Sequence, residues 1–290
     1  LKRKIINEVI DYNKKLFSKN KIDNESIILT EFSTNKSIQA GFSLFLRSLQ
    51  KKTGCKIYSY NNDLKLFDKK KKDLSQISKY VDQNYQIYNS FNVQKFINVS
   101  FEKKIFLKAK KKSKLLLKKI KTKKQLLNLK IESIWVGDLL YDSYLKDENM
   151  PTVNLKLKIF KRYFFKFIYL IYFWIDFFEK NKINFVITSH TVYSSAIPIR
   201  IALSKNLTSY QVNFHNVFRL NKKRLFAYDL FHDYKKIFNS LEKKVQIKAY
   251  DIADKQCRKR FGGEIGIDMY YSKKSAYLGI TKKRVLNNNK

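Results

Sequence analysis

Two segments of the chain have the order of apolar and polar residues that is typical of a strand–helix–strand unit. The first has an apolar run at 26–30, helical spacing of apolar residues over 36–52 and a second apolar run at 55–60. The second covers 185–213, where two β-branched runs flank an amphipathic stretch. Strands joined through a helix pair in parallel with a right-handed crossover. The pattern predicts an α/β fold, a Rossmann-like parallel sheet flanked by helices.

The most apolar part of the chain, 155–178, raises the question of a membrane span. Lys161, Arg162 and Lys166 interrupt its first half and Asp176 lies near its end. The uncharged stretch between them is much shorter than the roughly 20 residues that a span needs. We therefore predict a helix buried between layers of the fold.

A strongly basic helix is predicted from 103 to 130. No acidic residue occurs between Glu102 and Glu132, and the lysines of this stretch surround apolar residues at helical spacing. These apolar positions are Leu116, Ile120, Leu127 and Ile131. Two interpretations stay open for the lysines: a solvated helix face, or a surface that docks against lipid head groups.

The formal net charge of +37 has three explanations: contact with nucleic acid, attraction to an anionic membrane surface, and a drift toward lysine in the composition. Lysine greatly outnumbers arginine, which makes the bidentate contacts of sequence-specific readers, so no specific nucleic acid partner is expected. Cys55 and Cys257 lie far apart in apolar patterns and form no metal-binding spacing. We expect buried thiols, no metal site and a cytoplasmic protein, peripheral at the inner membrane face if the lysines bind lipid.

The predicted domain organisation is simple. Residues 1–280 are expected to form one Rossmann-like domain, with the basic helical insertion at about 100–130. Residues 281–290 are expected to be a tail, or a linker to a further C-terminal domain.

His190 is the first candidate for function. It follows the apolar run 185–189, and ligands of open α/β sheets bind beyond the carboxyl ends of the strands. His215 and Asn216 follow the next predicted strand, at the same edge, so we expect both histidine-bearing turns to face one crevice. The alternative for His190 is a residue that only caps its turn.

A second candidate is the pair Asp138 and Asp142, which stand four residues apart. On a helix they share a face, and Gly137 would let backbone or ligand come close. Paired carboxylates can perform acid–base chemistry, and Tyr141 lies between them in the sequence. The alternative is a helix cap and a partner for a tyrosine.

Several of these segments together resemble a known family. The stretch 137–146, the aromatic helix, the strand ending Ser189-His190-Thr191-Val192-Tyr193 and the stretch 199–203 occur in the order found in the N-terminal half of glycosyltransferases of bacterial capsule and surface polysaccharide synthesis. Phe261-Gly262-Gly263 followed by Tyr270-Tyr271-Ser272 is similar to the same region. The resemblance covers about 131–279.

The resemblance implies a GT-B architecture, in which two Rossmann-like domains face each other across a cleft. The first domain binds the acceptor, here a polysaccharide or lipid-linked glycan, and the nucleotide-sugar donor is expected in a second domain that this fragment lacks, so no cofactor is expected here. The chain has no Asp-x-Asp metal motif, consistent with a metal-independent enzyme. His190 would then be the catalytic base, with Asp138 or Asp142 as second choice.

The remaining candidate residues would contact the acceptor: Tyr193, His215, Asn216, Gly137 and Tyr141. Two other functions stay open at this stage. One is a non-catalytic component of polysaccharide assembly or export, which would keep the fold without needing His190. The other is a basic nucleic-acid-binding protein, which would use the same lysines.

Overall fold

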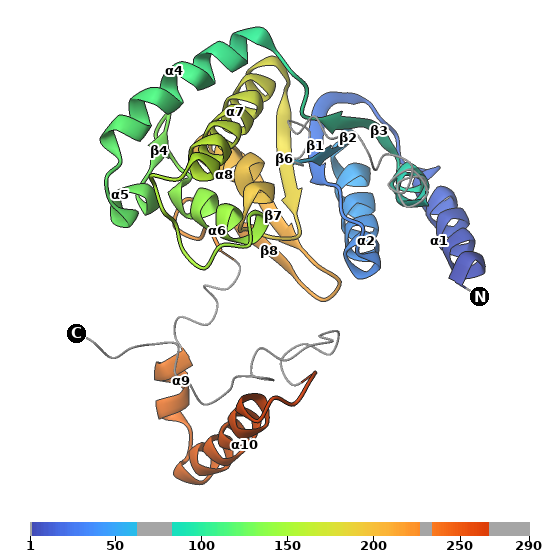
Figure 1. The fold of residues 1–290 in the computed structure, drawn as a ribbon. Coiled ribbons are helices and arrows are strands. Elements are labelled where there is room, and N and C mark those ends of the chain that lie inside the picture. The colour runs from blue at the N-terminus through green and yellow to red at the C-terminus, as the bar shows by residue number, and fades with distance from the viewer. Residues whose placement is uncertain (1, 63–82, 227–233, 267–290) are drawn as a thin grey trace. The chain divides into compact units, whose positions relative to one another are not determined.

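The computed structural model describes residues 2–62, 83–226 and 234–266 (Figure 1). Contacts within the chain divide it into two compact units, Leu1–Ala227 and Tyr228–Lys290. The expected single domain of residues 1–280 is therefore corrected: α9 (Tyr234–Ser240) and α10 (Lys243–Phe261) belong to the second unit. Neither helix buries a side chain, so neither contributes to the core of the sheet domain. The expected tail, 281–290, and Tyr270–Ser272 lie outside the described residues.

The first unit is built on a six-stranded sheet in the order β3-β2-β1-β6-β7-β8. All neighbours are parallel except β7 and β8, which form a hairpin. This order, with β1 inside and the chain winding outward to both sides, is that of a Rossmann-like sheet, and the predicted α/β fold is confirmed at this level. The strands are β1 (Asn24–Glu31), β2 (Cys55–Asn61), β3 (Val93–Asn98), β6 (Ile183–Thr188), β7 (Thr208–Val212) and β8 (Val217–Leu220).

Helices cover both faces of the sheet, which explains why its central strands are apolar without alternation. Ile28 of β1 packs with α1 (Lys2–Phe17) and α2 (Lys36–Thr53) on one face. Ile27 and Leu29 point to the other face, into a core formed with α6 (Gly137–Asp147), α7 (Lys158–Lys180) and α8 (Ile197–Ser204). One apolar run thus contributes to two separate cores.

Helix α7 is the centre of the second core, and its predicted burial is confirmed. Fourteen of its side chains are buried, including Trp174 and, at 9 % exposure, Lys166. Helix α4 (Lys103–Lys119) lies alongside α7 (Figure 1). Within the described part of the chain, no helix combines the length and apolar character needed to cross a bilayer.

The basic insertion is present, but the single helix predicted for 103–130 is wrong. Helix α4 ends at Lys119, the next residue, Ile120, has an extended backbone, and α5 (Lys123–Leu127) begins after Thr122. Thr122 and Gln125 form a reciprocal capping box, which starts a new helix there. The chain then enters a two-stranded ribbon of β4 (Lys130–Ile131) and β5 (Ile134–Trp135). The Thr122-x-x-Gln125 spacing was the sequence signal for this break.

The two cysteines differ in their surroundings. Cys55 begins β2 and is buried, as expected. Cys257 is exposed on α10, so the predicted burial of this thiol is wrong. Its neighbours in the helix pattern are apolar, but α10 buries none of its side chains.

Candidate functional site at the carboxyl edge of the sheet

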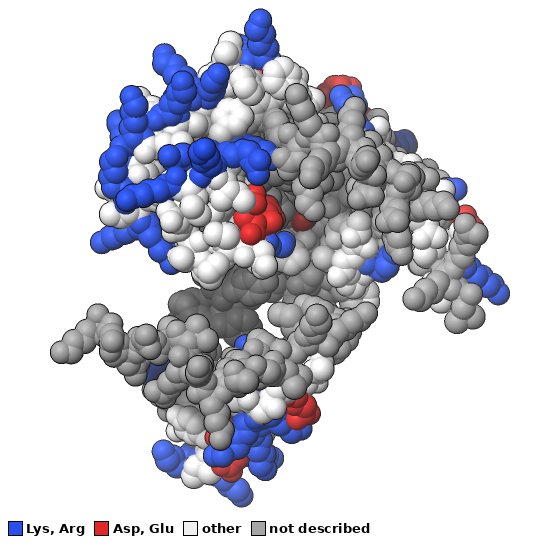
Figure 2. All heavy atoms as spheres, in the orientation of Figure 1, with Lys and Arg blue, Asp and Glu red and all other residues white. Residues whose placement is uncertain are grey.

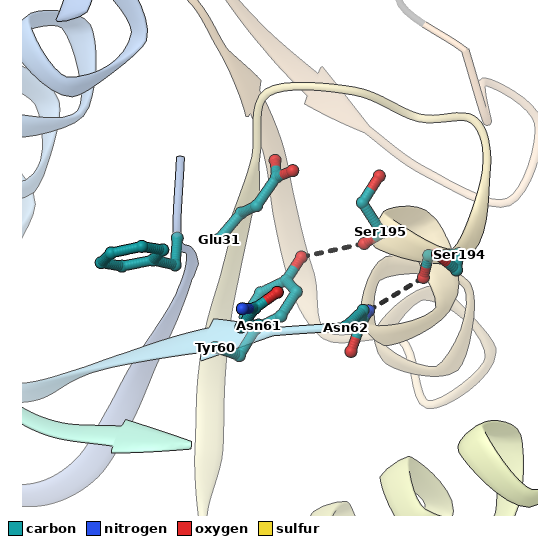
Figure 3. Close-up of a pocket in the computed structure, with 7 residues that line it drawn as sticks. Glu31, Tyr60, Asn61, Asn62, Ser194 and Ser195 are labelled. Carbon is teal, nitrogen blue, oxygen red and sulfur yellow. Dashed lines mark hydrogen bonds between the residues drawn. The ribbon is translucent and has the colours of Figure 1, made fainter. Parts of the chain in front are cut away.

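The carboxyl ends of β1 and β2 and the turn that follows β6 border a cavity. Strand β1 pairs with β2 on one side and β6 on the other, so the chain reverses its winding direction here. In open α/β sheets such a switch point leaves a crevice that binds ligands. The cavity has a volume of about 240 Å³ (Figure 3). It is lined by Glu31, Phe32, Tyr60, Asn61, Asn62, Ser194 and Ser195.

Hydrogen bonds fix the wall that joins β2 to the loop after β6. The Tyr60 hydroxyl donates to the Ser195 carbonyl at 3.0 Å, and the Asn62 amide donates to the Ser194 carbonyl at 2.8 Å (Figure 3). The Trp174 indole N–H of α7 donates to Asn62 Oδ1 at 2.6 Å. Burial, followed by the nearby Glu31 charge, raises the pKa of Tyr60, so its hydroxyl stays a proton donor. The wall is therefore positioned before any ligand binds.

The Glu31 carboxylate links β1 to β6. Its Oε2 accepts hydrogen bonds from the Thr188 hydroxyl at 2.8 Å, the Ser189 N–H at 2.6 Å and the Ser189 hydroxyl at 2.7 Å. No hydrogen bond to Oε1 is found among the described residues. This oxygen borders the cavity and can accept a hydrogen bond from a ligand hydroxyl.

His190 is connected to the same carboxylate through Ser189. Its Nδ1 lies 2.7 Å from Ser189 Oγ. A carboxylate has no proton to donate, so the single hydroxyl proton of Ser189 is used in the bond to Glu31. The tautomer that fits this bond carries its proton on Nδ1, donates to Ser189 Oγ and has Nε2 as an acceptor. The order Glu31, Ser189, His190 thus fixes the orientation of an exposed imidazole.

Tyr193 follows in a strained backbone conformation. Its φ of 61° and ψ of −171° fall in a region that is almost exclusive to glycine, at a cost of about 1–3 kcal/mol. The Lys146 ammonium of α6 lies 4.2 Å from the centre of its ring. Such strain persists where the surroundings fix the backbone. The two residues that follow Tyr193, Ser194 and Ser195, line the cavity.

His215 and Asn216 lie at the same edge of the sheet, in the turn between β7 and β8. The Asn213 side chain accepts hydrogen bonds from the backbone N–H groups of both residues, at 3.0 and 2.8 Å. Both side chains are exposed, and neither they nor His190 line the described cavity. The expected common edge is present, but the expected shared crevice is corrected: the described cavity is lined from β1, β2 and Ser194–Ser195, and neither histidine takes part in it.

Asp138 has a structural partner. Its Oδ2 lies 2.6 Å from an Nη of Arg200, whose side chain is only 2 % exposed. The Arg200 guanidinium also donates to the Trp135 carbonyl, and its carbon lies 4.7 Å from the ring centre of Trp135 and 5.1 Å from that of Phe226. A carboxylate used to neutralise a buried arginine is a poor base, so this geometry does not support catalysis by Asp138.

Asp142 is the remaining carboxylate of the pair. Helix α6 places it on the face of Asp138, as expected, and its pKa is raised by partial burial and by the Asp138 charge, while Lys123 opposes the shift. Because this pKa is higher in the folded than in the unfolded chain, the group lowers the stability of the fold as the pH rises from its unfolded through its folded pKa.

We therefore expect Asp142→Asn to increase the free energy of unfolding at pH 7, by less than about 1 kcal/mol because the carboxyl is largely solvated. The gain should disappear below the unfolded pKa, where both side chains are neutral. Urea unfolding of both proteins across pH 3–7 measures the difference. A gain that is the same at every pH would show that charge is not its cause.

Gly137 and Tyr141 have contacts within the insertion. A Cβ on Gly137 would lie 2.1 Å from the Leu126 carbonyl oxygen, so this glycine permits close packing of α5 on α6. It is buried, and the predicted contact with substrate is corrected to a contact with backbone. The Lys123 ammonium lies over the Tyr141 ring, 4.4 Å from the ring centre. Neither residue lines the cavity.

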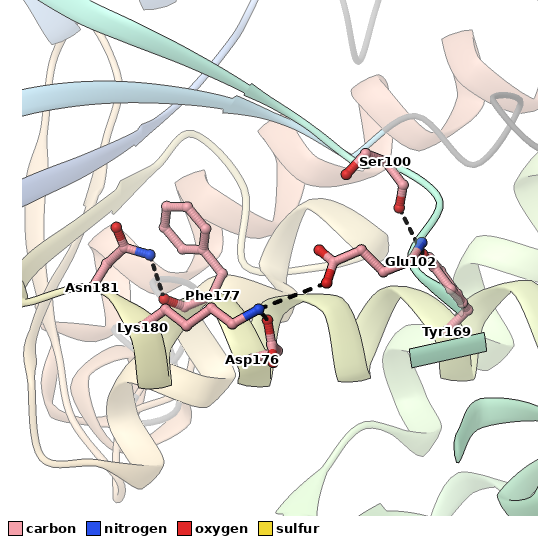
Figure 4. Close-up of polar contacts among 7 residues, drawn as sticks. All are labelled: Ser100, Glu102, Tyr169, Asp176, Phe177, Lys180 and Asn181. Atoms are coloured by element: carbon pink, nitrogen blue, oxygen red, sulfur yellow. Dashed lines mark hydrogen bonds and ion pairs between the residues drawn. The ribbon is translucent and has the colours of Figure 1, made fainter. Parts of the chain in front are cut away.

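A second cavity of about 240 Å³ lies between β3, the segment before α4, and α7. Its charges are compensated: Lys180 Nζ lies 2.6 Å from Asp176 and 3.7 Å from Glu102 (Figure 4). The Tyr169 hydroxyl accepts from the Glu102 N–H and donates to the Ser100 carbonyl, at 2.8 and 2.6 Å. These contacts attach the start of α4 to α7 and give the cavity a structural role.

No group of three or more metal-binding side chains occurs among the residues that the structure describes. Comparison with known proteins identified no matching family model, and neither the curated proteins nor the solved structures contain a significant match. The functional argument therefore depends on the site itself.

Glu31, Tyr60 and Asn62 are the site residues that the sequence analysis missed. Each lies at the carboxyl end of a predicted strand, the same signal that identified His190. They were not found because the neighbour of β1 on its far side, β6, is more than 150 residues away in the chain.

Proposed function

We propose that the sheet domain is the acceptor-binding domain of a GT-B glycosyltransferase of capsule or surface polysaccharide synthesis. The observation that carries the proposal is the polar cavity at the switch point, connected through Glu31 and Ser189 to the imidazole of His190. Amide, hydroxyl and carboxylate groups line it, as suits a ligand rich in hydroxyl groups. The acceptor is a polysaccharide or lipid-linked glycan, which places the reaction beside the inner membrane face.

In the proposed reaction, His190 Nε2 takes the proton of an acceptor hydroxyl. The acceptor oxygen forms a bond with the anomeric carbon of the donor sugar, and the bond between that carbon and the nucleotide phosphate breaks. The nucleotide leaves with the electron pair. In a GT-B arrangement the nucleotide-sugar is held by the second Rossmann-like domain, and the residues described here bind and deprotonate the acceptor.

Binding of saccharides to the full chain tests the acceptor site. We expect saturable binding of at least one member of a panel of capsule-type oligosaccharides and lipid-linked glycans, measured by saturation-transfer NMR. Glu31→Gln should weaken this binding about tenfold, because it removes a charged acceptor at the cavity. Asn61→Ala, at the same cavity, should also weaken it.

Glu102→Gln is the matched control, since this carboxylate borders the second cavity. It should bind the saccharide as the unaltered chain does. Circular dichroism melting confirms that each variant is folded. Absence of binding throughout the panel, or equal effects of Glu31→Gln and Glu102→Gln, would contradict the proposed site.

A further inference from the structure

Helix α4 carries a concentration of charge that the transferase proposal does not use. Nine of its seventeen residues are lysines and none is acidic. Lys121, Lys123, Lys124 and Lys130 follow in and around α5. Figure 2 shows the basic side chains gathered over the part of the unit where α4 lies in Figure 1. Lysine is common throughout the chain, but α10, also basic, includes Asp251 and Asp254 among its charges.

The inner side of α4 is fixed to the fold. Ile105, Ala109 and Ser113 are buried along the side where α4 contacts α7. The polar contacts of Glu102 with Lys180 and Tyr169 hold the segment that leads into the helix (Figure 4). The opposite side of the helix is therefore a preformed surface.

That opposite side combines lysines with exposed leucines. Leu107 and Leu115 are 55 % and 49 % exposed, although a leucine favours burial. Lys104 and Lys111 stand three and four residues from Leu107, and Lys111 and Lys118 stand four and three from Leu115, so the charges surround the apolar side chains. We call this surface the outer face of α4; it consists of Lys104, Leu107, Lys111, Lys114, Leu115 and Lys118.

We propose that the outer face of α4 docks on an anionic lipid bilayer. The lysines would contact lipid phosphates, and the two leucines would enter the boundary between head groups and acyl chains. A nucleic acid fits less well: the outer face has no arginine for bidentate contacts, no aromatic ring for stacking, and two leucines that a phosphate backbone cannot bury. The proposal does not depend on the transferase function.

Sedimentation of the full chain with vesicles tests this surface. In about 0.1 M salt the chain should bind vesicles of equal phosphatidylglycerol and phosphatidylcholine, and not vesicles of phosphatidylcholine alone. The variant Lys111→Gln/Lys114→Gln/Lys118→Gln should bind roughly 100-fold more weakly. The variant Leu107→Ser/Leu115→Ser, with all lysines retained, should bind about tenfold more weakly.

Matched controls come from other exposed positions of the same unit. Lys14→Gln/Lys15→Gln/Lys51→Gln removes the same charge from α1 and α2, and Leu44→Ser removes a leucine that is 57 % exposed. Both should bind nearly as the unaltered chain does. The proposal is overturned if no anionic vesicle is bound, if the controls lose as much affinity as the α4 variants, or if the leucine pair has no effect. Binding to a random DNA duplex as tightly as to vesicles would also overturn it.

Discussion

Replacing His190 by alanine should, under the proposed function, lower the kcat of glycosyl transfer by about 100- to 10,000-fold, the range that a general base contributes. The reason is the arrangement in which Glu31 and Ser189 hold the proton on Nδ1 and leave Nε2 to accept another. Ser189→Ala should reduce kcat less, because it leaves the imidazole in place and removes only what orients it. Steady-state kinetics with nucleotide-sugar and acceptor measures both effects.

The same kinetic experiment distinguishes the roles of His190 and His215, the two histidines at this edge of the sheet. His215→Ala should leave kcat unchanged, because that exposed side chain has no connection to Glu31 and does not line the cavity. The thermal midpoint of His190→Ala should stay near that of the unaltered enzyme, since the imidazole is exposed. Unchanged turnover in the folded His190→Ala enzyme would remove this residue from the mechanism.

Replacing Asp138 by alanine should reduce the free energy of unfolding by about 3–5 kcal/mol, the largest stability effect we expect. The loss arises because Arg200, 2 % exposed, would keep its charge inside the protein without the carboxylate at 2.6 Å. Urea unfolding followed by circular dichroism measures it. Asp138 then serves to join α6 to α8, and a loss of activity in this variant reports unfolding.

A double-mutant cycle isolates the interaction energy between Asp138 and Arg200. Asp138→Ala/Arg200→Met should recover much of the lost stability, because the apolar replacement removes the uncompensated charge and can still pack against Trp135 and Phe226. Asp142→Ala, on the same helix, is the control and should change the stability little. An Asp138→Ala protein as stable as the unaltered chain would leave Asp138 available for chemistry.

Part of the candidate site could be predicted from the sequence. His190 and His215 were assigned to one edge because parallel strands end at the same edge, and the structure places both turns there. Gly137 and Asp138 were placed on a helix, but their partners, the Leu126 carbonyl and Arg200, come from other elements. Spacing along one helix carries no information about such partners.

Local patterns in the sequence determined the helices and strands. The apolar run through Ile28 is a strand covered on both faces. The charges within α7 excluded a membrane span, and its apolar residues form a core. Both elements follow from the spacing of apolar residues along the sequence, which is a local property of the chain. Only the tertiary structure decided that Glu31 meets Ser189, that α4 and α5 are separate helices, and that the second unit begins near residue 228. The physical reason is that the sheet pairs β1 with β6, which are far apart in the sequence. The spacing of residues within a strand shows which face each side chain occupies, but not which other strand lies beside it.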